Sequence, residues 1–439
     1  MKLEITKLPY LDNSSILLNK LQPKGGLVAL ESSLPNHENG RWSIISAEPA
    51  ETVTAFGKTN NQDITDKLSS LFNKIPANES DLPFTGGLIG HASYDLGIAS
   101  NNPIAQPTPS SLPTLIAGLY TWAFLIDHLT NCTVLVYLAE LSKTSKEDLI
   151  LLFHKAKDHP QTATQFEIKE PFQPTWTKKK YQENIQSIHS YINAGDVYQV
   201  NLAQSFSSQY TGNPIYGYEK LKKFASVPFA SFFNYKQFYF ASASPELFIS
   251  TDRGAVTTKP IKGTLPRKTS TQEDKLQANQ LKNSKKDQAE NLMIVDLLRN
   301  DISKNATNVK VPSLFNVETF ETVHHLVSTV TASLPNTISP LKLFLDAFPG
   351  GSITGAPKKR AMEVINELEA TPRGFYCGSA FYHSANDKFN SNILIRSFMF
   401  EEGKVTCWSG GGIISDSIWE LELQESLDKI SKLMECLNN

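Results

Sequence analysis

The 439-residue sequence has little that is typical of a secreted or membrane-spanning protein. It contains only four cysteines, and no two of them form a Cys-x-x-Cys pair: Cys132, Cys377, Cys407 and Cys436. This spacing argues against a zinc site and against a disulfide framework. The longest apolar stretch, residues 115–126, is shorter than the roughly 20 residues that cross a bilayer. Residues 2–7 carry charges where a signal peptide needs an apolar core. We therefore expect a cytoplasmic protein with no membrane partner.

A surplus of one charge sign is also absent. The 42 lysines and arginines nearly balance the 44 aspartates and glutamates, for a net charge of −2 at pH 7. Nucleic-acid-binding chains usually carry a clear basic surplus, so we expect no nucleic-acid partner. The hydrophobic fraction of 40% argues against wholesale disorder, and the length allows a large core with more than one structural unit.

A polar, proline-rich segment over residues 167–177 predicts a boundary between two regions, residues 1–170 and 171–437. The first region reads as mostly β, with two long apolar strands expected within residues 115–138. The second region opens on a helix, because Tyr181, Ile185 and Ile188 recur at helical spacing before a capping glycine, Gly195.

Two later helices each carry a pair of acidic residues three positions apart, which places both members on one face. A single long helix is predicted over residues 271–302, and it carries Asp287 and Glu290. A second is predicted over residues 416–433, and it carries Glu422 and Glu425. Four such carboxylates suit a hard cation such as Mg²⁺. Taken one pair at a time, a solvated helix surface explains the spacing better.

The stretch from residue 258 to residue 267 is polar and interrupted by Pro260, Gly263 and Pro266. Proline removes a ladder donor and glycine weakens a strand, so an interior strand is not expected here. Lys262 lies directly before Gly263, where the missing side chain allows a ligand or another backbone to approach. On these residues alone, the alternative of a surface turn with a solvated lysine is the better interpretation.

Two glycine-rich segments lie in the last hundred residues. Residues 348–358 run into a predicted helix over residues 359–369, whose first turn favours anions. Residues 408–414 can expose backbone amides to a carboxylate. Arg396 lies in an apolar strand pattern between these segments, and we expect it to have an anionic partner.

Seven segments of the second region together resemble the chorismate-utilising enzymes, the family that contains anthranilate, isochorismate and aminodeoxychorismate synthases. They span residues 178–436 almost continuously and follow the family's order. These segments are residues 195–204, 244–248, 260–264, 287–301, 324–328, 349–358 and 410–417. The first 170 residues match more loosely, through residues 30–33, 41–42 and 94–96.

The residue at position 262 separates the branches of this family. The motif of the anthranilate synthases at this point looks like Pro-Ile-Ala-Gly-Thr, and that of the aminodeoxychorismate synthases looks like Pro-Ile-Lys-Gly-Thr. Residues 260–264 of this chain match the second motif. The resemblance implies an enzyme that replaces the C4 hydroxyl of chorismate with ammonia, giving 4-amino-4-deoxychorismate for 4-aminobenzoate and folate synthesis. It also implies an α/β (α+β) fold of two large antiparallel sheets packed together, with flanking helices.

The resemblance further implies a role for each candidate residue. Lys262 would attack chorismate covalently, with Glu246 as general acid or base and His325 beside the departing hydroxyl. Mg²⁺ would be held by Glu290 and Glu425, with Glu422 and Asp287 close by. The substrate would contact Thr264, Thr354, Tyr382, Arg396, Gly410, Gly411 and Gly412.

Ammonia would come from a separate glutamine amidotransferase subunit, because no nucleophilic cysteine with a histidine partner is evident in this chain. The family's first half can hold tryptophan, so residues 1–170 are a candidate tryptophan-binding region. Two alternatives remain open at this point. One is the first component of anthranilate synthase, and the other is a catalytically weak protein that binds the glutaminase.

Overall fold

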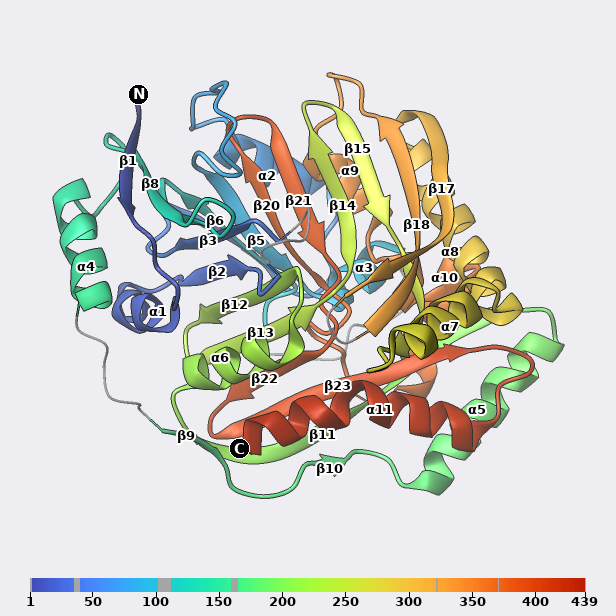
Figure 1. The fold of residues 1–439 in the computed structure, drawn as a ribbon. Helices are drawn as coiled ribbons and strands as arrows, with labels where there is room; N and C mark the ends of the chain where they lie inside the picture. The colour runs from blue at the N-terminus through green and yellow to red at the C-terminus, as the bar shows by residue number, and fades with distance from the viewer. Residues whose placement is uncertain are drawn as a thin grey trace.

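The computed structural model describes residues 2–34, 40–101, 112–158, 165–320, 323–369 and 371–438 (Figure 1). Thirteen strands form one antiparallel sheet. In sheet order they are β1 (Leu3–Pro9), β8 (Cys132–Leu138), β7 (Trp122–Asp127), β3 (Trp42–Ser46), β2 (Val28–Glu31), β12 (Phe229–Tyr235), β13 (Phe238–Ser244), β22 (Ser397–Glu401), β23 (Lys404–Ile413), β11 (Gln199–Gly212) and β10 (Gln173–Pro174), with β9 (Phe166–Ile168) and β19 (Gly355–Ala356) also paired to β11.

Ten strands form the second antiparallel sheet. Their order is β16 (Ile261–Pro266), β18 (Val323–Ser333), β15 (Ala255–Lys259), β14 (Leu247–Asp252), β21 (Lys388–Asn392), β20 (Ser379–Ser384), β5 (Gly87–Ala92), β6 (Leu115–Tyr120) and β4 (Thr52–Ala55), with β17 (Thr307–Thr319) also paired to β18. The predicted fold class, two large antiparallel sheets with flanking helices, is confirmed.

Helices cover the outer faces of both sheets (Figure 1). They are α1 (Ser15–Leu21), α2 (Asn61–Phe72), α3 (Tyr94–Asn101), α4 (Lys146–Asp158), α5 (Lys178–Asn193), α6 (Pro214–Ala225), α7 (Thr271–Lys282), α8 (Lys285–Ser303), α9 (Pro340–Ala347), α10 (Lys358–Leu368) and α11 (Trp419–Asn438), with short 3-10 turns at Gln22–Lys24 and Gly351–Ile353. Within the described residues, no helix is both long enough and apolar enough to cross a membrane.

Aromatic side chains fill the space between the two sheets. Phe233 and Phe240 of the thirteen-stranded sheet pack on Phe375, with ring centroids 5.0 and 5.7 Å from it. All three are almost fully buried, in one cluster with Ile89 of β5 in the opposite sheet. Such burial is worth roughly 1.5–3 kcal/mol for each large apolar side chain. This layer therefore holds the two sheets together.

Each sheet takes strands from both of the regions predicted from the sequence. β2, from residues 1–170, pairs with β12, from the second region, and β5 pairs with β20 in the same way. The boundary near residues 167–177 therefore does not separate two independent sheets.

Two sequence predictions about individual elements are wrong. The helix predicted over residues 271–302 is two helices, because Ser284 caps a new helix by accepting a hydrogen bond from the Asp287 amide at 3.3 Å. The apolar stretch 115–138 forms three strands rather than two. At Thr121 the chain passes from β6 in one sheet to β7 in the other, and both strands are buried, so no polar alternation marks the change.

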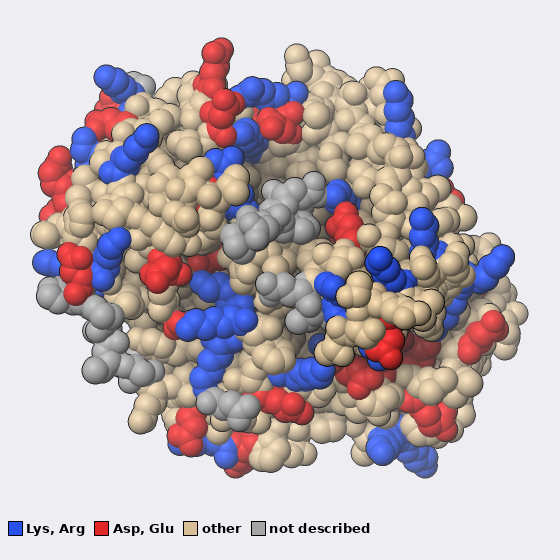
Figure 2. Space-filling view, viewed as in Figure 1, with Lys and Arg blue, Asp and Glu red and all other residues tan. Residues whose placement is uncertain are grey.

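The surface carries charges of both signs. On the face shown in Figure 2, lysines and arginines are interspersed with aspartates and glutamates. This distribution agrees with the balanced charge of the sequence.

Candidate active site

Lys262 lies on β16, the strand at the edge of the ten-stranded sheet. Its backbone is opposite Leu326 of β18, and the register shifts between Lys262 and Thr264. Gly263 makes this bulge possible with a φ of 71°, and a Cβ there would lie 2.8 Å from an oxygen of Asp287. The sequence was right to exclude an interior strand, and the glycine lets helix α8 approach the strand closely.

The Lys262 ammonium is enclosed by protein groups of both signs. Its Nζ donates a long hydrogen bond of 3.4 Å to the carbonyl oxygen of Ser352. Burial lowers the pKa of Lys262, while the carboxylates of Glu290 and Glu246 act in the opposite direction. The net shift is downward, which increases the fraction of neutral amine at a given pH. A buried lysine with a lowered pKa is suited to nucleophilic attack.

Glu246 is buried in the short link between β13 and β14. Its backbone is fixed at both ends, because its amide donates to Ser244 Oγ at 3.2 Å and its carbonyl accepts from the Ile393 amide at 3.1 Å. Burial raises the pKa of Glu246 to about 7, although the Ser352 hydroxyl and Lys262 oppose the rise. A carboxyl group with this pKa can both hold and release a proton near neutral pH.

His325 lies on β18 opposite Thr264, next to Leu326, which is the residue opposite Lys262. Its Nδ1 lies 2.8 Å from the Thr264 hydroxyl, and Phe320 packs edge-on against the ring with centroids 5.2 Å apart. Burial lowers the pKa of His325 to about 3, and the positive charge of Arg396 adds to the effect. The imidazole is therefore neutral at pH 7, so it can donate or accept a hydrogen bond but carries no charge.

Arg396 has a positive φ of 53° and a half-buried side chain. Burial lowers the pKa of its guanidinium. The sequence led us to expect an anionic partner, yet among the described residues the structure records no carboxylate within ion-pair distance. Leaving a buried guanidinium without a counter-charge is costly. An anionic ligand would supply the missing charge.

The four predicted metal carboxylates lie on α8 and α11 around Lys262. Burial raises the pKa of Glu290, and the negative charges of Asp287 and Glu425 add to this rise, while the positive charge of Lys262 opposes it. Near Gly411, a Cβ would lie 3.5 Å from an oxygen of Glu422 and 3.9 Å from one of Glu425. Within the described ranges, however, no three acidic, histidine or cysteine side chains already form a metal cage. Lysines hold two of these carboxylates, with Lys286 at 4.0 Å from Glu290 and Lys429 at 2.8 Å from Glu425.

The predicted glycine segment Gly410–Gly412 lies on β23. Glycine is required at Gly410, because a Cβ there would lie 2.2 Å from the Leu202 carbonyl oxygen. At Gly412 a Cβ would lie 2.3 Å from the side-chain nitrogen of Gln199, which would have to move. The pairing of β22 with β23 ends at Cys407, so beyond it β11 is the one neighbouring strand recorded for this part of β23. The other edge of the segment can present backbone groups to a ligand.

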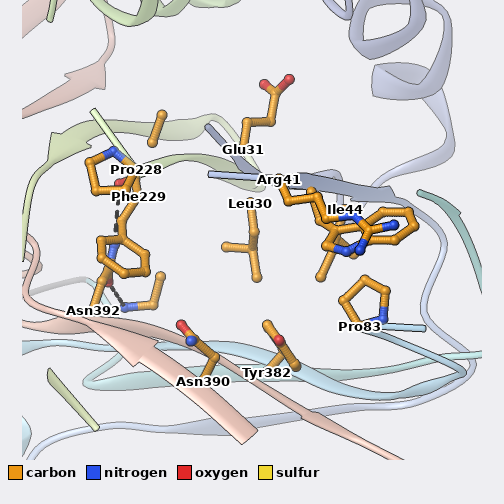
Figure 3. Close-up of a pocket in the computed structure, with 13 residues that line it drawn as sticks. Leu30, Glu31, Arg41, Ile44, Pro83, Pro228, Phe229, Tyr382, Asn390 and Asn392 are labelled. Atoms are coloured by element: carbon orange, nitrogen blue, oxygen red, sulfur yellow. Dashed lines mark hydrogen bonds between the residues drawn. The ribbon is translucent and has the colours of Figure 1, made fainter. Parts of the chain in front are cut away.

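Two of the predicted substrate contacts are placed differently from the rest. Thr354 is fully buried, and its hydroxyl donates to the Gly350 carbonyl oxygen at 3.0 Å, so this donor is already used within the turn. Tyr382 lines a separate pocket of about 170 Å³ between the two sheets (Figure 3). Among the described residues, no recorded contact links Tyr382 to Lys262 or Glu246; its recorded ring partner is Phe84.

Residues that carry the N-terminal resemblance also line this separate pocket. Leu30, Arg41 and Trp42 are among its lining residues. Asn390 lies beside Tyr382, across the pocket from Leu30 (Figure 3). The Arg41 guanidinium stacks 4.9 Å from the centre of the Trp42 ring. The carboxylate of Glu31 points away from the pocket, where Tyr218 and Lys222 each contact it at 2.9 Å. Glu31 therefore offers the pocket no free negative charge.

Comparison with known proteins gives the family. A family model described as "chorismate binding enzyme" matches residues 30–435. This chain is a chorismate-binding enzyme. It is 39% identical to aminodeoxychorismate synthase component 1 of Escherichia coli over 450 residues, covering 99% of this chain and 98% of that protein. It is 30% identical to anthranilate synthase component 1 of Aquifex aeolicus over 95% of this chain and 90% of that protein. The family predicted from the sequence is confirmed.

Solved structures of chorismate-binding enzymes share the fold. Anthranilate synthase component I of Streptococcus pneumoniae has a TM-score of 0.79 and 29% sequence identity, and the match covers 90% of this chain and 92% of that one. The menaquinone-specific isochorismate synthase of E. coli has a TM-score of 0.78 at 18% identity, which supports the fold alone. It covers 100% of this chain and 94% of that one.

Three further residues of this chorismate-binding enzyme lie beside the predicted ones. Ser352 contacts both Lys262 and Glu246. Lys429 donates to the Gly410 carbonyl oxygen at 3.1 Å as well as pairing with Glu425. Gln199 is fully buried, and neither of its amide atoms has a recorded partner. Signals for two of them were present in the sequence, since Ser352 lies inside the glycine-rich segment 348–358 and Lys429 follows Glu425 by four residues.

Proposed function

We propose that this chain converts chorismate and ammonia to 4-amino-4-deoxychorismate and water. The observation that carries the proposal is the position of Lys262, a partly buried amine of lowered pKa on a bulged edge strand, within the field of the ionisable Glu246. The similarity to aminodeoxychorismate synthase component 1 supports the same activity. The anthranilate synthases are related more distantly.

The proposed reaction has two displacement steps. The neutral amine of Lys262 forms a bond to C2 of chorismate as the C4–O bond breaks, and the departing hydroxide takes up a proton to leave as water. Ammonia then forms a bond to C4, and the C2–N bond to Lys262 breaks. This covalent route replaces one difficult substitution with two easier ones.

Glu246 would transfer protons, and His325 would act only as a hydrogen-bonding group. With a pKa raised to about 7, Glu246 can give a proton to the leaving hydroxyl and later accept one from the incoming ammonia. His325 is neutral, so it would orient the hydroxyl by a hydrogen bond rather than act as a strong acid. Thr264 holds the ring of His325 in place.

Arg396 and the segment Gly410–Gly412 would receive the two carboxylates of chorismate. The guanidinium offers a planar fork of donors that matches a carboxylate. Beyond Cys407 the glycine segment pairs with β11 but not with β22, and Lys429 already occupies its Gly410 carbonyl oxygen, so the remaining backbone groups would meet the ligand. Thr354 would hold the turn Gly351–Ile353 in place rather than contact chorismate, since its hydroxyl and its backbone groups are already hydrogen-bonded.

Mg²⁺ fits the chemistry of the donors around Lys262. Carboxylate oxygens are the ligands that Mg²⁺ prefers, and Glu290, Glu422, Glu425 and Asp287 supply them from two helices. We propose that Glu290 and Glu425 bind the ion directly and that Glu422 and Asp287 support them. Lys286 and Lys429 would then release the carboxylates they now hold. The bound ion would supply a fixed positive charge for the ring carboxylate of chorismate.

We also propose that the predicted regions divide the work of the protein. Residues 171–437 carry the groups around Lys262. Residues 1–170 supply Leu30, Arg41 and Trp42 to the separate pocket, to which we assign the tryptophan site implied by the resemblance. The apolar walls of the pocket would hold the indole ring of tryptophan. Because Glu31 is already paired with Lys222, the pocket would bind the α-ammonium group of tryptophan weakly.

A glutamine amidotransferase subunit is the proposed source of ammonia, and the cytoplasm is the proposed location. The name "component 1" of the E. coli relative supports the existence of a second component. The four cysteines are free thiols, which suits a reducing compartment.

A product assay tests the proposed function. Purified chain is mixed with chorismate, Mg²⁺ and an ammonium salt at mildly alkaline pH, and half of each sample receives a 4-amino-4-deoxychorismate lyase. We expect 4-aminobenzoate only in the samples with the lyase. Anthranilate formed without the lyase would assign the chain to the anthranilate synthases. Absence of any product would favour a catalytically weak binding protein.

A further inference from the structure

Lys358, the first residue of α10, has a buried ammonium group with three acceptors. Its Nζ donates to a carboxylate oxygen of Asp301, to the Ala347 carbonyl oxygen at 2.9 Å and to the Pro349 carbonyl oxygen at 2.9 Å. An ammonium group has three N–H donors, so every donor is used. The side chain is only 11% exposed. Lys358 therefore ties one carboxylate to the two ends of a short backbone segment.

The carboxylate belongs to helix α8, which also carries two of the proposed metal ligands. Asp301 is buried near the C-terminal end of that helix, whereas Asp287 and Glu290 lie near its beginning. Asp301 has a second partner, Lys304, at 2.9 Å, but that lysine side chain is 54% exposed. Lys358 and Lys304 therefore both pair with Asp301, but Lys358 also donates to the carbonyl oxygens of Ala347 and Pro349.

The backbone segment held by Lys358 leads directly into the active site. After Ala347 and Pro349 the chain turns through Gly351–Ile353, where the Ser352 carbonyl oxygen accepts the hydrogen bond from Lys262 Nζ at 3.4 Å. The Ser352 hydroxyl is also close enough to Glu246 to lower the pKa of its carboxyl group. One short turn therefore touches both the proposed nucleophile and the proposed acid.

We propose that Lys358 is a positioning residue that fixes this turn against helix α8 and so sets the direction of the Lys262 amine and the proton affinity of Glu246. A neutral amine has one lone pair, and its direction depends on where its N–H groups are donated. Donation to the Ser352 carbonyl oxygen constrains that direction. The inference rests on the proposed covalent role of Lys262 and adds a residue that touches neither substrate nor metal.

A purely structural role for the same ion pair would have different consequences. Removing one partner of a buried ion pair lowers the stability of the fold, because the other charge is left buried and unpaired. If stability were the whole contribution, the folded fraction of a variant would still react at the normal rate and with the normal pH profile. Positioning predicts that the folded variant itself reacts slowly.

The test measures formation of the Lys262 adduct in ammonia-free buffer with chorismate and Mg²⁺. The adduct adds the mass of chorismate less one water, because the C2–N bond forms as the C4–O bond breaks, and intact-mass spectrometry of quenched samples follows it. Lys358→Met keeps the apolar stem and removes the ammonium. Lys304→Met is the matched control, since it removes the exposed partner of the same aspartate. Only folded protein, isolated by gel filtration and checked by circular dichroism, is compared.

We expect adduct formation to slow at least about 10-fold in Lys358→Met and to stay within about 2-fold of the parent protein in Lys304→Met. We also expect the pH midpoint of kcat/KM in the ammonium-driven reaction to move by about half a unit or more in Lys358→Met alone. A folded Lys358→Met protein with normal rate and normal pH profile would overturn the inference.

Two further outcomes keep the proposals separate. If the parent protein forms no adduct, the covalent role of Lys262 fails first, and the pH profile of Lys358→Met then decides the positioning role by itself. If Lys358→Met does not yield folded protein, Asp301→Asn replaces it, with an expected slowing of about 3-fold or more. An unchanged rate and an unchanged pH profile in folded Asp301→Asn would overturn the inference as well.

Discussion

The hydroxyl of Thr264 and the Nδ1 atom of His325 lie 2.8 Å apart across the two strands at the edge of the ten-stranded sheet. The register shift at Gly263 brings Thr264 opposite His325 and leaves Lys262 opposite Leu326. The bulge therefore places Lys262 and His325 at neighbouring positions of one ladder. It also makes Thr264 a testable support for the imidazole.

Thr264→Val should lower kcat about 10-fold, because the ring of His325 loses the partner that holds its orientation. Thr264→Ser keeps the hydroxyl and should stay within about 2-fold of the parent. Steady-state rates with ammonium and the coupling lyase measure both. Equal rates in the valine and serine variants would show that the hydrogen bond has no part in the reaction.

Lys262→Ala should reduce formation of 4-amino-4-deoxychorismate by about 10³-fold or more, because no other amine replaces the covalent step. The products should also be examined for anthranilate, since alanine is the residue that anthranilate synthases are expected to carry here. Lys268→Ala, an exposed lysine just beyond the same strand, is the control and should be fully active. Normal product formation by Lys262→Ala would remove the covalent role.

Glu246→Gln should lose most activity and gain stability at alkaline pH. Burial raises the pKa of Glu246 from its ordinary value to about 7, so the folded state holds the proton more tightly than the unfolded state. Below the pKa that Glu246 has in the unfolded chain, both states hold the proton, and the buried carboxyl group does not destabilise the folded state. As the pH rises toward 7 this destabilisation of the folded state grows, and above 7 it is complete, at about 3 kcal/mol for a pKa raised from 4.5 to about 7.

Glutamine carries no such penalty. Urea unfolding at pH 5 and pH 8 should therefore show that the advantage of Glu246→Gln over the parent grows with pH. A constant difference between the two pH values would contradict the raised pKa.

Glu425→Gln should weaken the response to Mg²⁺ about 10-fold while leaving the melting temperature nearly unchanged. The Glu425 side chain is about half exposed, at 52%, so little packing is lost. Calorimetric titration of Mg²⁺ in the presence of chorismate measures the affinity. Asp428→Asn removes the same charge from an exposed position on the same helix and should bind Mg²⁺ normally. The assignment fails if both variants respond alike.

Arg396→Gln and Tyr382→Ala should behave differently. Loss of the guanidinium removes a charge-assisted hydrogen bond to a substrate carboxylate, so KM for chorismate should rise about 10- to 100-fold. Tyr382 lines the separate pocket, and its replacement should leave KM within about 2-fold. A large KM increase in Tyr382→Ala would return that residue to the chorismate site.

The sequence predicted the family and the fold because the relevant motifs are short, ordered and unusual. It singled out Lys262, Glu246, His325 and Arg396; in the structure Glu246 acts on the pKa of Lys262 and Arg396 on that of His325, and their roles stay predictions. The sequence did not predict features that depend on how distant segments pack together. The alternating pattern around Tyr382 could not reveal that its side chain faces the gap between the sheets. The apolar run through Thr121 hid a passage from one sheet to the other, since both strands are buried.

The strand order has a consequence for how the protein is made. In both sheets the strands translated late lie between strands translated much earlier. β22 and β23 connect β13 to β11, and β21 and β20 connect β14 to β5. A chain growing on the ribosome therefore cannot complete either sheet before residues 379–413 emerge, although domains often fold during synthesis from the N-terminus. Until then the early strands expose unpaired edges, so a chain truncated before residue 379 should depend on chaperones and aggregate rather than form a smaller stable domain.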